Sequence, residues 1–308
     1  MARGRGALTH STILINLPNS TVNRKQHMLD VGRYEVVVRD GIGRIRDKAS
    51  GEVMHSVNDP AEEAHALYVE QSRLVERLQE TSTEPLVVWD VGLGAAANAM
   101  ATIQAAEAMN VADRGRRLLL ISFENDLNSL KLALHHRQWF KHLEHAAPEQ
   151  LLAEGRWVSQ DGSIEWRLLK GDFATLKFVA PLPDLIFFDP FSFKTDSKLW
   201  AVASFRELLQ VCNGHATELF TYTNSTAVRA AMLVAGFYVA KGCATGPKSE
   251  TTIGLSPLAA IGSHRRELLG AAWLLRWSRS GAQTPFGVSA NDESWRAAVT
   301  EHPQFQLT

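Results

Sequence analysis

Four acidic residues end or directly follow apolar segments that have the composition of β-strands. They are Asp90, Glu124, Asp172 and Asp189. The carboxyl ends of parallel strands lie at one edge of a sheet, and the ligands of open α/β sheets bind outside that edge. The sequence therefore predicts one site lined by carboxylates, although a helix cap or a solvated loop charge is the alternative for each acid taken singly.

The loop that begins at Asp189 contains the residue types best suited to catalysis, in the order D-P-F-S-F. A carboxylate beside an amine can accept its proton and stabilise the positive charge that develops on nitrogen when the amine acts as a nucleophile. We therefore expect Asp189 to be the catalytic residue, with a plain capping Asp as the alternative. Phe191 or Phe193 could stack on a planar ring. We expect Phe191, Ser192 and the more distant Lys248 to contact the substrate.

A glycine-rich turn follows the first acid. The segment from Leu86 to Asp90 leads into Gly92 and Gly94 and then into a run of alanines. Glycine lets backbone N–H groups approach a ligand, and the following helix adds the positive end of its dipole. This order of strand, tight turn and helix is typical of the first unit of a doubly wound α/β domain, although a similar turn can join any strand to a helix.

Strand-like and helical segments alternate along most of the chain. The expected strands are 86–90, 117–124, 164–169, 183–189 and 218–223. The expected helices are 95–109, 127–142, 148–154, 198–209 and 226–235. Helix-length connections imply a mostly parallel sheet with right-handed crossovers. The last two strands, 237–242 and 251–254, are joined by a link too short for a crossover and must be antiparallel. The predicted fold is thus α/β, a mostly parallel seven-stranded sheet with a terminal antiparallel hairpin, as in Rossmann-like S-adenosylmethionine-dependent methyltransferases.

Composition shifts divide the chain into four predicted parts. They are a mobile N-terminal segment, a β-hairpin and helix that pack on the core, the methyltransferase domain and a helical C-terminal extension: 1–29, 30–84, 85–256 and 257–308. The hairpin turns at Asp40–Gly41. The helix is expected to begin at a cap formed by Asn58 and Asp59 before Pro60 and to reach about Glu80. The extension is expected to contain helices at 265–279 and 293–299.

The acids at the sheet edge match the parts of S-adenosylmethionine. Glu124 is placed for the ribose hydroxyls, with Asn125 beside it, and Asp172 with Phe173 suits the adenine. Asp90 and the backbone at the two glycines would meet the amino-acid tail. NAD is the alternative, because G-L-G-A-A-A also satisfies a loose dinucleotide pattern. Glu124 lies 32 positions after Gly92, whereas a dinucleotide fold places its acid about 20 residues on, so the spacing favours S-adenosylmethionine.

Composition limits the possible partners and surroundings. The net charge of −1 over 308 residues gives no global attraction for nucleic acid. A local basic face could bind phosphate, although a solvated face is the commoner reading; its members would be Lys241, Lys248, Arg265, Arg266, Arg276 and Arg279. The only cysteines, Cys212 and Cys243, are expected to be core thiols in a reducing compartment. No apolar run is long enough to cross a membrane and no secretory signal is evident, which favours a cytoplasmic protein.

Four histidines crowd one predicted helix and its end. They are His135, His136, His142 and His145. No acid or cysteine joins them at the spacing of metal ligands, so we expect solvated or capping histidines and no metal site.

Ordered motifs in the chain resemble the MnmD and MnmC methyltransferase family, which completes 5-methylaminomethyl-2-thiouridine at the tRNA wobble position. The matching stretches are M-H-S-V-N-D-P-A-E-E-A-H-A-L-Y-V from Met54, D-V-G-L-G from Asp90, L-I-S-F-E-N from Leu120, W-R-L-L-K-G-D from Trp166, D-L-I-F-F-D-P-F-S from Asp184, Y-T-N-S-T-A-V-R-A-A-M-L-V-A-G-F from Tyr222 and G-P-K-S-E-T-T from Gly246. Together they span about residues 34–254. Their order is more specific than any single motif.

This resemblance implies a methyl donor, S-adenosyl-L-methionine, and a tRNA substrate recognised at the anticodon stem-loop. It implies Asp189 as the catalytic residue and Glu124 as the ribose ligand, with Glu63 and Tyr68 closing over the cofactor. The usual D-G-F-x-P is D-P-F-S-F here, which leaves the shape of the loop and the substrate open. Nothing resembling the FAD-dependent half of MnmC follows, so a separate enzyme would supply the aminomethyl precursor. A methyltransferase of another small amine, a nicotinamide oxidoreductase and a non-catalytic binding module remain alternatives.

Overall fold

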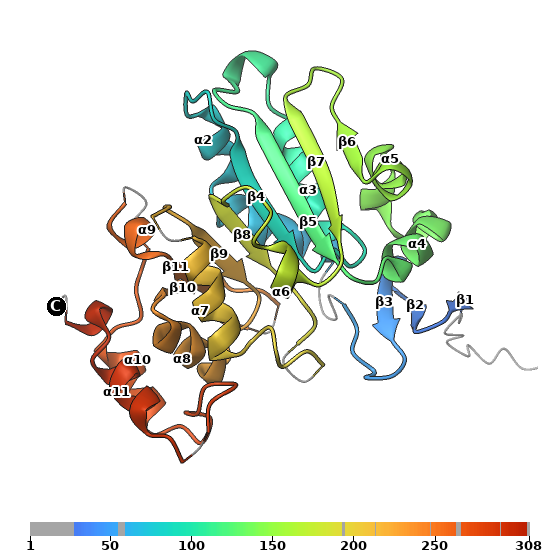
Figure 1. Ribbon diagram of the computed structural model, residues 1–308. Helices are drawn as coiled ribbons and strands as arrows, with labels where there is room; N and C mark the ends of the chain where they lie inside the picture. The colour runs from blue at the N-terminus through green and yellow to red at the C-terminus, as the bar shows by residue number, and fades with distance from the viewer. Residues whose placement is uncertain are drawn as a thin grey trace, which may run out of the picture.

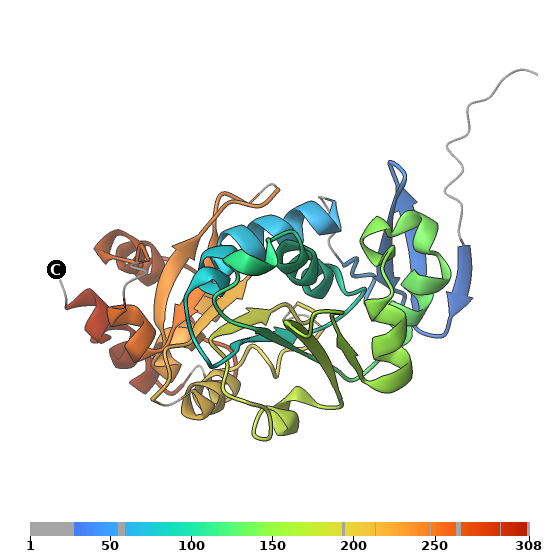
Figure 2. The same cartoon turned by 90° about the horizontal axis from the view of Figure 1, so that it is seen from above.

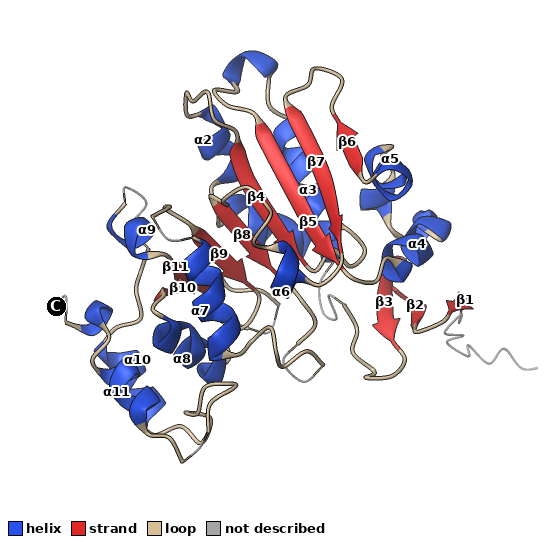
Figure 3. Ribbon diagram, viewed as in Figure 1, coloured by secondary structure: helices blue, strands red, loops and turns tan. Residues whose placement is uncertain are grey.

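The chain is described here from a computed structural model, which covers residues 28–54, 59–192, 195–212, 214–246, 248–262, 266–289 and 291–306. Its centre is an eight-stranded sheet with the strand order β10-β11-β9-β8-β4-β5-β7-β6 (Figures 1 and 3). The strands are β4 Leu86–Val91, β5 Leu118–Glu124, β6 Arg156–Val158, β7 Ile164–Lys170, β8 Leu185–Phe188, β9 Glu218–Thr221, β10 Tyr238–Gly242 and β11 Thr251–Leu255.

The pairing of these strands confirms the predicted α/β fold. Strands β9, β8, β4, β5 and β7 are parallel neighbours. Strand β11 runs antiparallel between β9 and β10, so the terminal antiparallel hairpin is present. The eighth strand, β6, was not expected; it is a three-residue edge strand antiparallel to β7. Such a short strand leaves almost no periodic pattern in a sequence.

Helices cover both faces of the sheet (Figure 2). One face packs on the N-terminal half of the chain, in α1 Pro60–Ala64, η1 His65–Glu70, α2 Leu74–Gln79, α3 Ala97–Glu107, α4 Asn128–His135 and α5 Ala147–Glu154. The other face packs on α6 Phe173–Leu176, α7 Val202–Val211, α8 Thr226–Ala235, α10 Ala271–Ser278 and α11 Ser294–Thr300. The short helix α9 Pro257–Ile261 follows β11. Alternate strand residues supply the two cores, as Val88 and Trp89 of β4 illustrate.

A small second sheet lies beside α4, away from the terminal hairpin (Figures 1 and 2). It contains β1 Met28–Val31, β2 Tyr34–Arg39 and β3 Ile42–Asp47. The predicted hairpin is present, since Asp40 and Gly41 connect β2 to β3 with φ of 54° and 77°. Strand β1 was not expected. Residues 1–27, which we expected to be mobile, lie outside the described residues.

The helix predicted to run from Pro60 to Glu80 is interrupted. Asp59 caps its start by accepting from the N–H of Ala61 at 2.8 Å, whereas Asn58 lies outside the described residues. The chain then passes through the π-helix η1, and Arg73 in a left-handed conformation separates η1 from α2. The hydroxyl of Ser72 bonds the carbonyl of Tyr68 at 2.6 Å, so a side chain takes the acceptor that helix continuation requires.

Two other predicted helices are shorter than expected. The helix predicted over 127–142 ends at His135 and continues as separate 3-10 turns, which lets the ring of His142 reach the carbonyl of Ala95 at 2.9 Å. The helix predicted over 265–279 begins only at Ala271. The residues before it run extended along β10, where the N–H of Leu269 donates to Val239 at 2.8 Å.

The two cysteines differ in environment. Cys212 is a buried core thiol, as predicted. The same prediction for Cys243 is wrong, because that residue follows the end of β10 and is exposed. Within the described residues, no group of three or more His, Cys, Asp or Glu side chains is placed to hold a metal ion, and no helix is long and apolar enough to span a membrane.

Candidate active site

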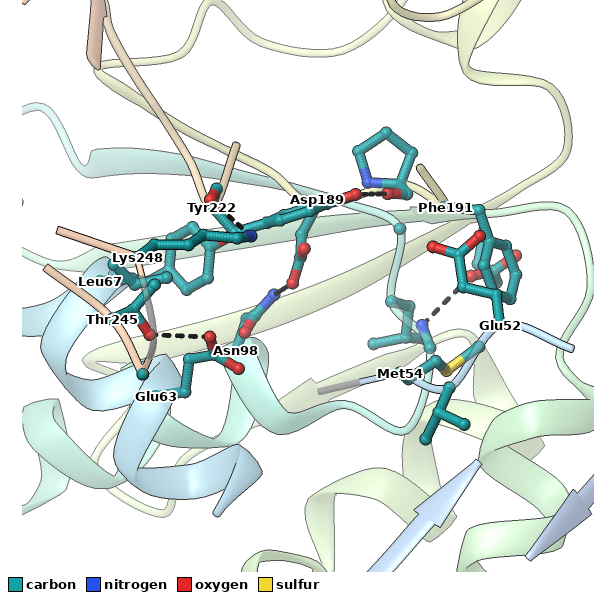
Figure 4. A pocket seen from close by; sticks show the side chains of 18 of the residues that line it. Glu52, Met54, Glu63, Leu67, Asn98, Asp189, Phe191, Tyr222, Thr245 and Lys248 are labelled. Carbon is teal, nitrogen blue, oxygen red and sulfur yellow. Dashed lines mark hydrogen bonds between the residues drawn. The ribbon is translucent and has the colours of Figure 1, made fainter. Parts of the chain in front are cut away.

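A cavity of about 420 Å³ lies at the carboxyl ends of β4 and β8 (Figure 4). Its lining joins segments far apart in the sequence: the segment after β3, helices α1 and η1, the glycine turn, the loop after β8 and the β10–β11 loop. Eight of the residues predicted for the site line it, namely Glu63, Tyr68, Gly92, Gly94, Glu124, Asp189, Phe191 and Lys248. The edge of the sheet chosen from sequence is therefore the edge that carries the cavity.

Five predicted site residues are not among the residues that line the cavity. Asp90 is fully buried beneath it and accepts from the hydroxyl of Ser122 at 2.7 Å, and Asn125 is exposed. Asp172 caps α6 through the N–H of Ala174, and Phe173 packs in the core of the opposite face. The structure thus gives Asp172 and Phe173 structural contacts, and their role toward adenine stays a prediction.

Ser192, the fifth of these residues, is held by Glu52, which follows β3. Glu52 accepts from the Ser192 N–H and hydroxyl, each at 3.0 Å, and from the hydroxyl of Thr195 at 2.6 Å. Phe193 lies outside the described residues. The Ser192 side chain therefore fixes the loop after β8, and its contact with substrate stays a prediction.

Phe191 in the same loop also contacts the N-terminal sheet. Its ring stacks on Tyr34 with centroids 6.4 Å apart and planes within 7°. The guanidinium of Arg33 lies 5.6 Å from the Phe191 ring centroid. One face of Phe191 is therefore already covered by protein.

Close packing makes glycine necessary at the turn after β4. Gly92 has a φ of 91°, and a Cβ on it would lie 2.6 Å from the carbonyl oxygen of Asp189. The N–H of Asp189 donates to Val91 at 2.9 Å, which extends the pairing of β4 and β8 to the site itself. The N–H of Gly94 donates to the carboxylate of Glu124 at 3.2 Å. Gly92 therefore allows the glycine turn to approach the loop that begins at Asp189.

Asn98 of α3 holds the carboxylate of Asp189. The Asn98 side-chain nitrogen donates to Asp189 Oδ2 at 2.7 Å (Figure 4). Asn98 is buried and sits in the first turn of the helix that follows the glycine loop. On the other side of the loop, the Tyr222 hydroxyl donates to the carbonyl of Pro190 at 3.3 Å. The side chain of Asp189 and the backbone of the loop after β8 are therefore both held by hydrogen bonds.

The β10–β11 loop closes the cavity against the N-terminal helices. Thr245 donates to Glu63 at 2.8 Å, so the loop is tied to α1. Lys248 donates to the carbonyl of Tyr222 at 3.1 Å, and its ammonium lies 4.7 Å from the Tyr222 ring centroid. Burial lowers the pKa of Lys248, an effect opposed by the charges of Glu63 and Asp189. Lys248 therefore places a positive charge among the acids of the site.

Burial dominates the electrostatics of the acids. It raises the pKa of Asp90 to about 7, with smaller contributions from the charges of Asp189 and Glu124. Burial also raises the pKa of Glu124, although backbone N–H groups that donate to its carboxylate oppose the shift. Among the described residues that line the cavity, four are carboxylates, Glu52, Glu63, Glu124 and Asp189, and one, Lys248, carries an ammonium. The site therefore favours a cation over an anion.

Sequence reasoning missed five lining residues that shape the site: Glu52, Met54, Asn98, Tyr222 and Thr245. Asn98 could have been found from the sequence, because it lies in the first turn of the helix that follows the glycine turn, and that helix begins at the edge of the sheet that binds ligands. Glu52 carried none, since its partners lie about 140 positions away.

The residues present fit S-adenosyl-L-methionine. The cavity has the size of a small-molecule site and an excess of negative charge for a sulfonium. Two residues that line it, Tyr68 and Asn98, each have a buried polar atom, Oη and Oδ1, without a hydrogen-bond partner within the described part of the chain.

Comparison with known proteins agrees with this chemistry. Residues 135–257 match the model of a family described as S-adenosyl-L-methionine-dependent methyltransferases. The chain is 28% identical over 217 residues to the tRNA 5-methylaminomethyl-2-thiouridine biosynthesis bifunctional protein MnmC of Aeromonas hydrophila, covering 66% of this chain and 32% of that protein. It is 29% identical over 234 residues to MnmC of Ralstonia nicotianae, covering 73% of this chain and 34% of that protein.

A solved structure shares the fold. The crystal structure of MNMC2 from Aquifex aeolicus superposes with a TM-score of 0.64 at 18% identity, over 90% of this chain and 86% of that one. The family match and the two relatives identify the chain as an S-adenosyl-L-methionine-dependent methyltransferase, and they favour this class over the nicotinamide alternative. Within that class, its resemblance to the MnmD and MnmC methyltransferase family is confirmed. It spans about a third of the length of the two curated relatives.

Proposed function

We propose that this methyltransferase transfers one methyl group to the amine of 5-aminomethyl-2-thiouridine at the wobble position of tRNA. The observation that carries the proposal is the Asp189 carboxylate, which lines the cavity and is held at 2.7 Å by Asn98. The names of the two relatives support the choice of substrate, because both refer to biosynthesis of 5-methylaminomethyl-2-thiouridine in tRNA.

The residues that line the cavity could carry out the proton transfer, charge stabilisation and positioning that methylation of an amine requires. S-adenosyl-L-methionine, when bound, supplies a methyl group on a positively charged sulfur. The Asp189 carboxylate accepts an N–H of the amine and stabilises the positive charge that develops on nitrogen. Asn98 and the Pro190 backbone contact keep that carboxylate in place, so the amine meets an already oriented acceptor. The remaining cavity acids favour the cationic donor over its neutral product.

The tRNA part of the proposal depends on the relatives rather than on charge. Two members of the predicted basic face are paired with acids, Lys241 with Glu267 and Arg266 with Glu218, and Arg265 lies outside the described residues. The anticodon stem-loop as the recognised region, a separate enzyme that supplies the aminomethyl precursor, and a cytoplasmic location belong to this proposal.

The experiment that tests the function uses a labelled methyl donor with three acceptors. They are tRNA bearing 5-aminomethyl-2-thiouridine, the same tRNA lacking the aminomethyl group, and a polyamine. We expect label only in the wobble nucleoside of the first, and a loss of at least a hundredfold in kcat for Asp189→Asn with donor binding retained. Label in the polyamine alone would favour the small-amine alternative. Donor binding without transfer to any acceptor would favour a non-catalytic module.

A further inference from the structure

The ammonium of Lys248 is a hydrogen-bond donor to which the proposed amine methylation assigns no task. Lys248 is partly buried and lines the cavity, and its Nζ donates to the carbonyl of Tyr222 at 3.1 Å. An ammonium carries three N–H groups, and this contact is the only hydrogen bond of that nitrogen within the described residues. Two N–H groups of Lys248 can therefore bind a ligand.

The order of the strands places Lys248 on the acceptor side of Asp189. Strand β8, which leads into Asp189, lies between β4 and β9 in the sheet. The predicted donor ligands lie on one side of it, since the glycine turn follows β4 and Glu124 ends β5. Lys248 lies on the other side, in the β10–β11 loop, and its side chain reaches toward Asp189 (Figure 4). A donor held by the glycine turn thus leaves this side of the cavity to the methyl acceptor.

We propose that Lys248 donates a hydrogen bond to the carbonyl oxygen that flanks the aminomethyl group on the acceptor ring, which makes Lys248 the residue that selects a uracil-like ring over a simple amine. This inference rests on the proposed amine methylation. It divides recognition between two charges, because Asp189 binds the amine and Lys248 binds the flanking oxygen.

The chemistry of the acceptor suits this pair of charges. In a 5-aminomethyl uracil, four bonds separate the amine nitrogen from the flanking oxygen, so the two atoms lie about 3 Å apart in a bent arrangement. Hydrogen bonds of about 2.9 Å at each end let this unit bridge a carboxylate and an ammonium up to about 9 Å apart. A phosphate suits the position less well, because the four described carboxylates of the cavity wall repel an anion, whereas a carbonyl is neutral.

Tyr222 connects the two charges. Its hydroxyl donates at 3.3 Å to the carbonyl of Pro190, the residue after Asp189, while its own carbonyl accepts from Lys248. The ammonium also lies 4.7 Å from the centroid of the Tyr222 ring. Burial lowers the pKa of Lys248 and the charges of Glu63 and Asp189 oppose this effect, so the ammonium lies within electrostatic reach of the catalytic carboxylate.

The loop that carries Lys248 is held from both sides. Arg229 of α8, which is only 2% exposed, donates to Glu250 and to the carbonyl of Thr251, each at 2.7 Å. Thr245 pairs its backbone with that of Lys248 at 2.9 and 3.0 Å, and its hydroxyl ties the loop to α1. A donor on a loop that is already ordered loses little freedom when it binds, so its hydrogen bond contributes to selectivity.

The test combines variants of the enzyme with variants of the acceptor. The acceptors are two tRNAs, one bearing 5-aminomethyl-2-thiouridine and one bearing its 4-deoxy analogue, in which hydrogen replaces the flanking oxygen. The enzymes are wild type, Lys248→Met, which removes the charge from a chain of similar length, and Glu250→Ala, which removes a contact of the loop outside the cavity. Lys241→Met is the control, since Lys241 lies on the same hairpin, pairs with Glu267 and does not line the cavity.

We expect wild type to prefer the oxygen-bearing acceptor by at least tenfold in kcat/KM, because the analogue leaves a donor of the site unpaired. Lys248→Met should lose at least tenfold on that acceptor and change less than threefold on the analogue, which abolishes the preference. Glu250→Ala should reduce the preference and raise amide exchange over residues 243–250. Lys241→Met should keep the preference, and calorimetry should show donor affinity within threefold of wild type for every variant.

Three outcomes would overturn the inference while leaving the function intact. An equal loss by Lys248→Met on both acceptors would assign the ammonium to another part of the RNA, such as a phosphate. A tenfold loss of donor affinity with an unchanged preference would assign it to the carboxylate of the donor. Equal use of the two acceptors by wild type would exclude recognition of the flanking oxygen. Wild-type protein that binds the donor but methylates neither tRNA would instead refute the proposed function, and the inference with it.

Discussion

Replacing Glu52 with Ala should lower the reaction rate, because it loosens the loop after β8 that begins at Asp189. Glu52 accepts three hydrogen bonds from Ser192 and Thr195, at 3.0, 3.0 and 2.6 Å. A net value near 1 kcal/mol for each bond gives a total of about 3 kcal/mol. Because the loop also contains Asp189, this energy holds the catalytic carboxylate in its position.

The expected effects separate loop geometry from folding. A displacement of about 1 Å at a reacting group can cost about a hundredfold in rate, so Glu52→Ala should lower kcat by at least tenfold. Donor affinity should change by less than about threefold, because the glycine turn and Glu124 are untouched. If the whole loss reached global stability, Tm would fall by roughly 6–12 °C, at about 2–4 °C for each kcal/mol.

The assay measures kcat and KM for amine methylation together with donor affinity by calorimetry and amide exchange over residues 188–200. Glu35→Ala is the matched control, since Glu35 lies in the same N-terminal sheet and pairs with Arg46 instead of the loop. Exchange in the loop should rise for Glu52→Ala alone. A kcat within twofold of wild type for Glu52→Ala would refute the reasoning.

Three further predictions address the cavity wall. Gly92→Ala should weaken donor binding by at least tenfold and lower Tm, because its Cβ would lie 2.6 Å from the Asp189 carbonyl; Gly162→Ala, with a φ of 71° and open space around it, should lower Tm slightly and leave calorimetric affinity unchanged. Tyr68→Phe should stabilise the free protein by about 1 kcal/mol in urea unfolding while weakening ligand binding, since it removes a buried hydroxyl without a described partner; equal affinity would exclude that hydroxyl from the ligand site. In the folded protein the pKa of Asp90 is raised from 3.8 to about 7, so the folded state binds a proton that the unfolded state releases. The free energy of unfolding should therefore fall by up to about 4 kcal/mol as pH rises from about 4 to 7. Urea unfolding across that range should show this slope for wild type and not for Asp90→Asn.

Local chemistry explains which parts of the fold could be predicted from sequence. Strands that end in acids and the glycine turn have short-range signatures, so the mostly parallel sheet with its terminal hairpin and the position of Asp189 at the sheet edge followed from them. The break before α2 did not, because it depends on one Ser72 hydroxyl competing for a helix carbonyl. The edge strand β6 was too short to show a period.

Long-range pairing explains what the sequence left open at the site. Asp172 obeyed the same pattern as Asp189, yet its carboxylate caps a helix while Asp189 faces the cavity. Acids at the ends of two strands therefore have different environments in this chain, a helix cap at Asp172 and a cavity wall at Asp189. Asp172 and Asp189 differ in the position of their strands in the sheet. Strand β8 pairs directly with β4, which leads into the glycine turn, whereas β5 lies between β7 and β4.

The departure of the catalytic loop from D-G-F-x-P to D-P-F-S-F has a structural counterpart in the N-terminal sheet. Ser192 gives Glu52 both an N–H and a hydroxyl to bind, and Phe191 presents its ring to Tyr34. The loop therefore takes its shape from residues on and just after the small sheet rather than from its own sequence. Two consequences follow. The N-terminal sheet supports the wall of the cavity through this loop, although within the described residues it shares no strand pairing with the main sheet. Replacing Ser192 by a residue without a hydroxyl removes one of the three hydrogen bonds to Glu52 and leaves those from the Ser192 N–H and the Thr195 hydroxyl, so the effects of changes at Ser192 and Glu52 should be non-additive.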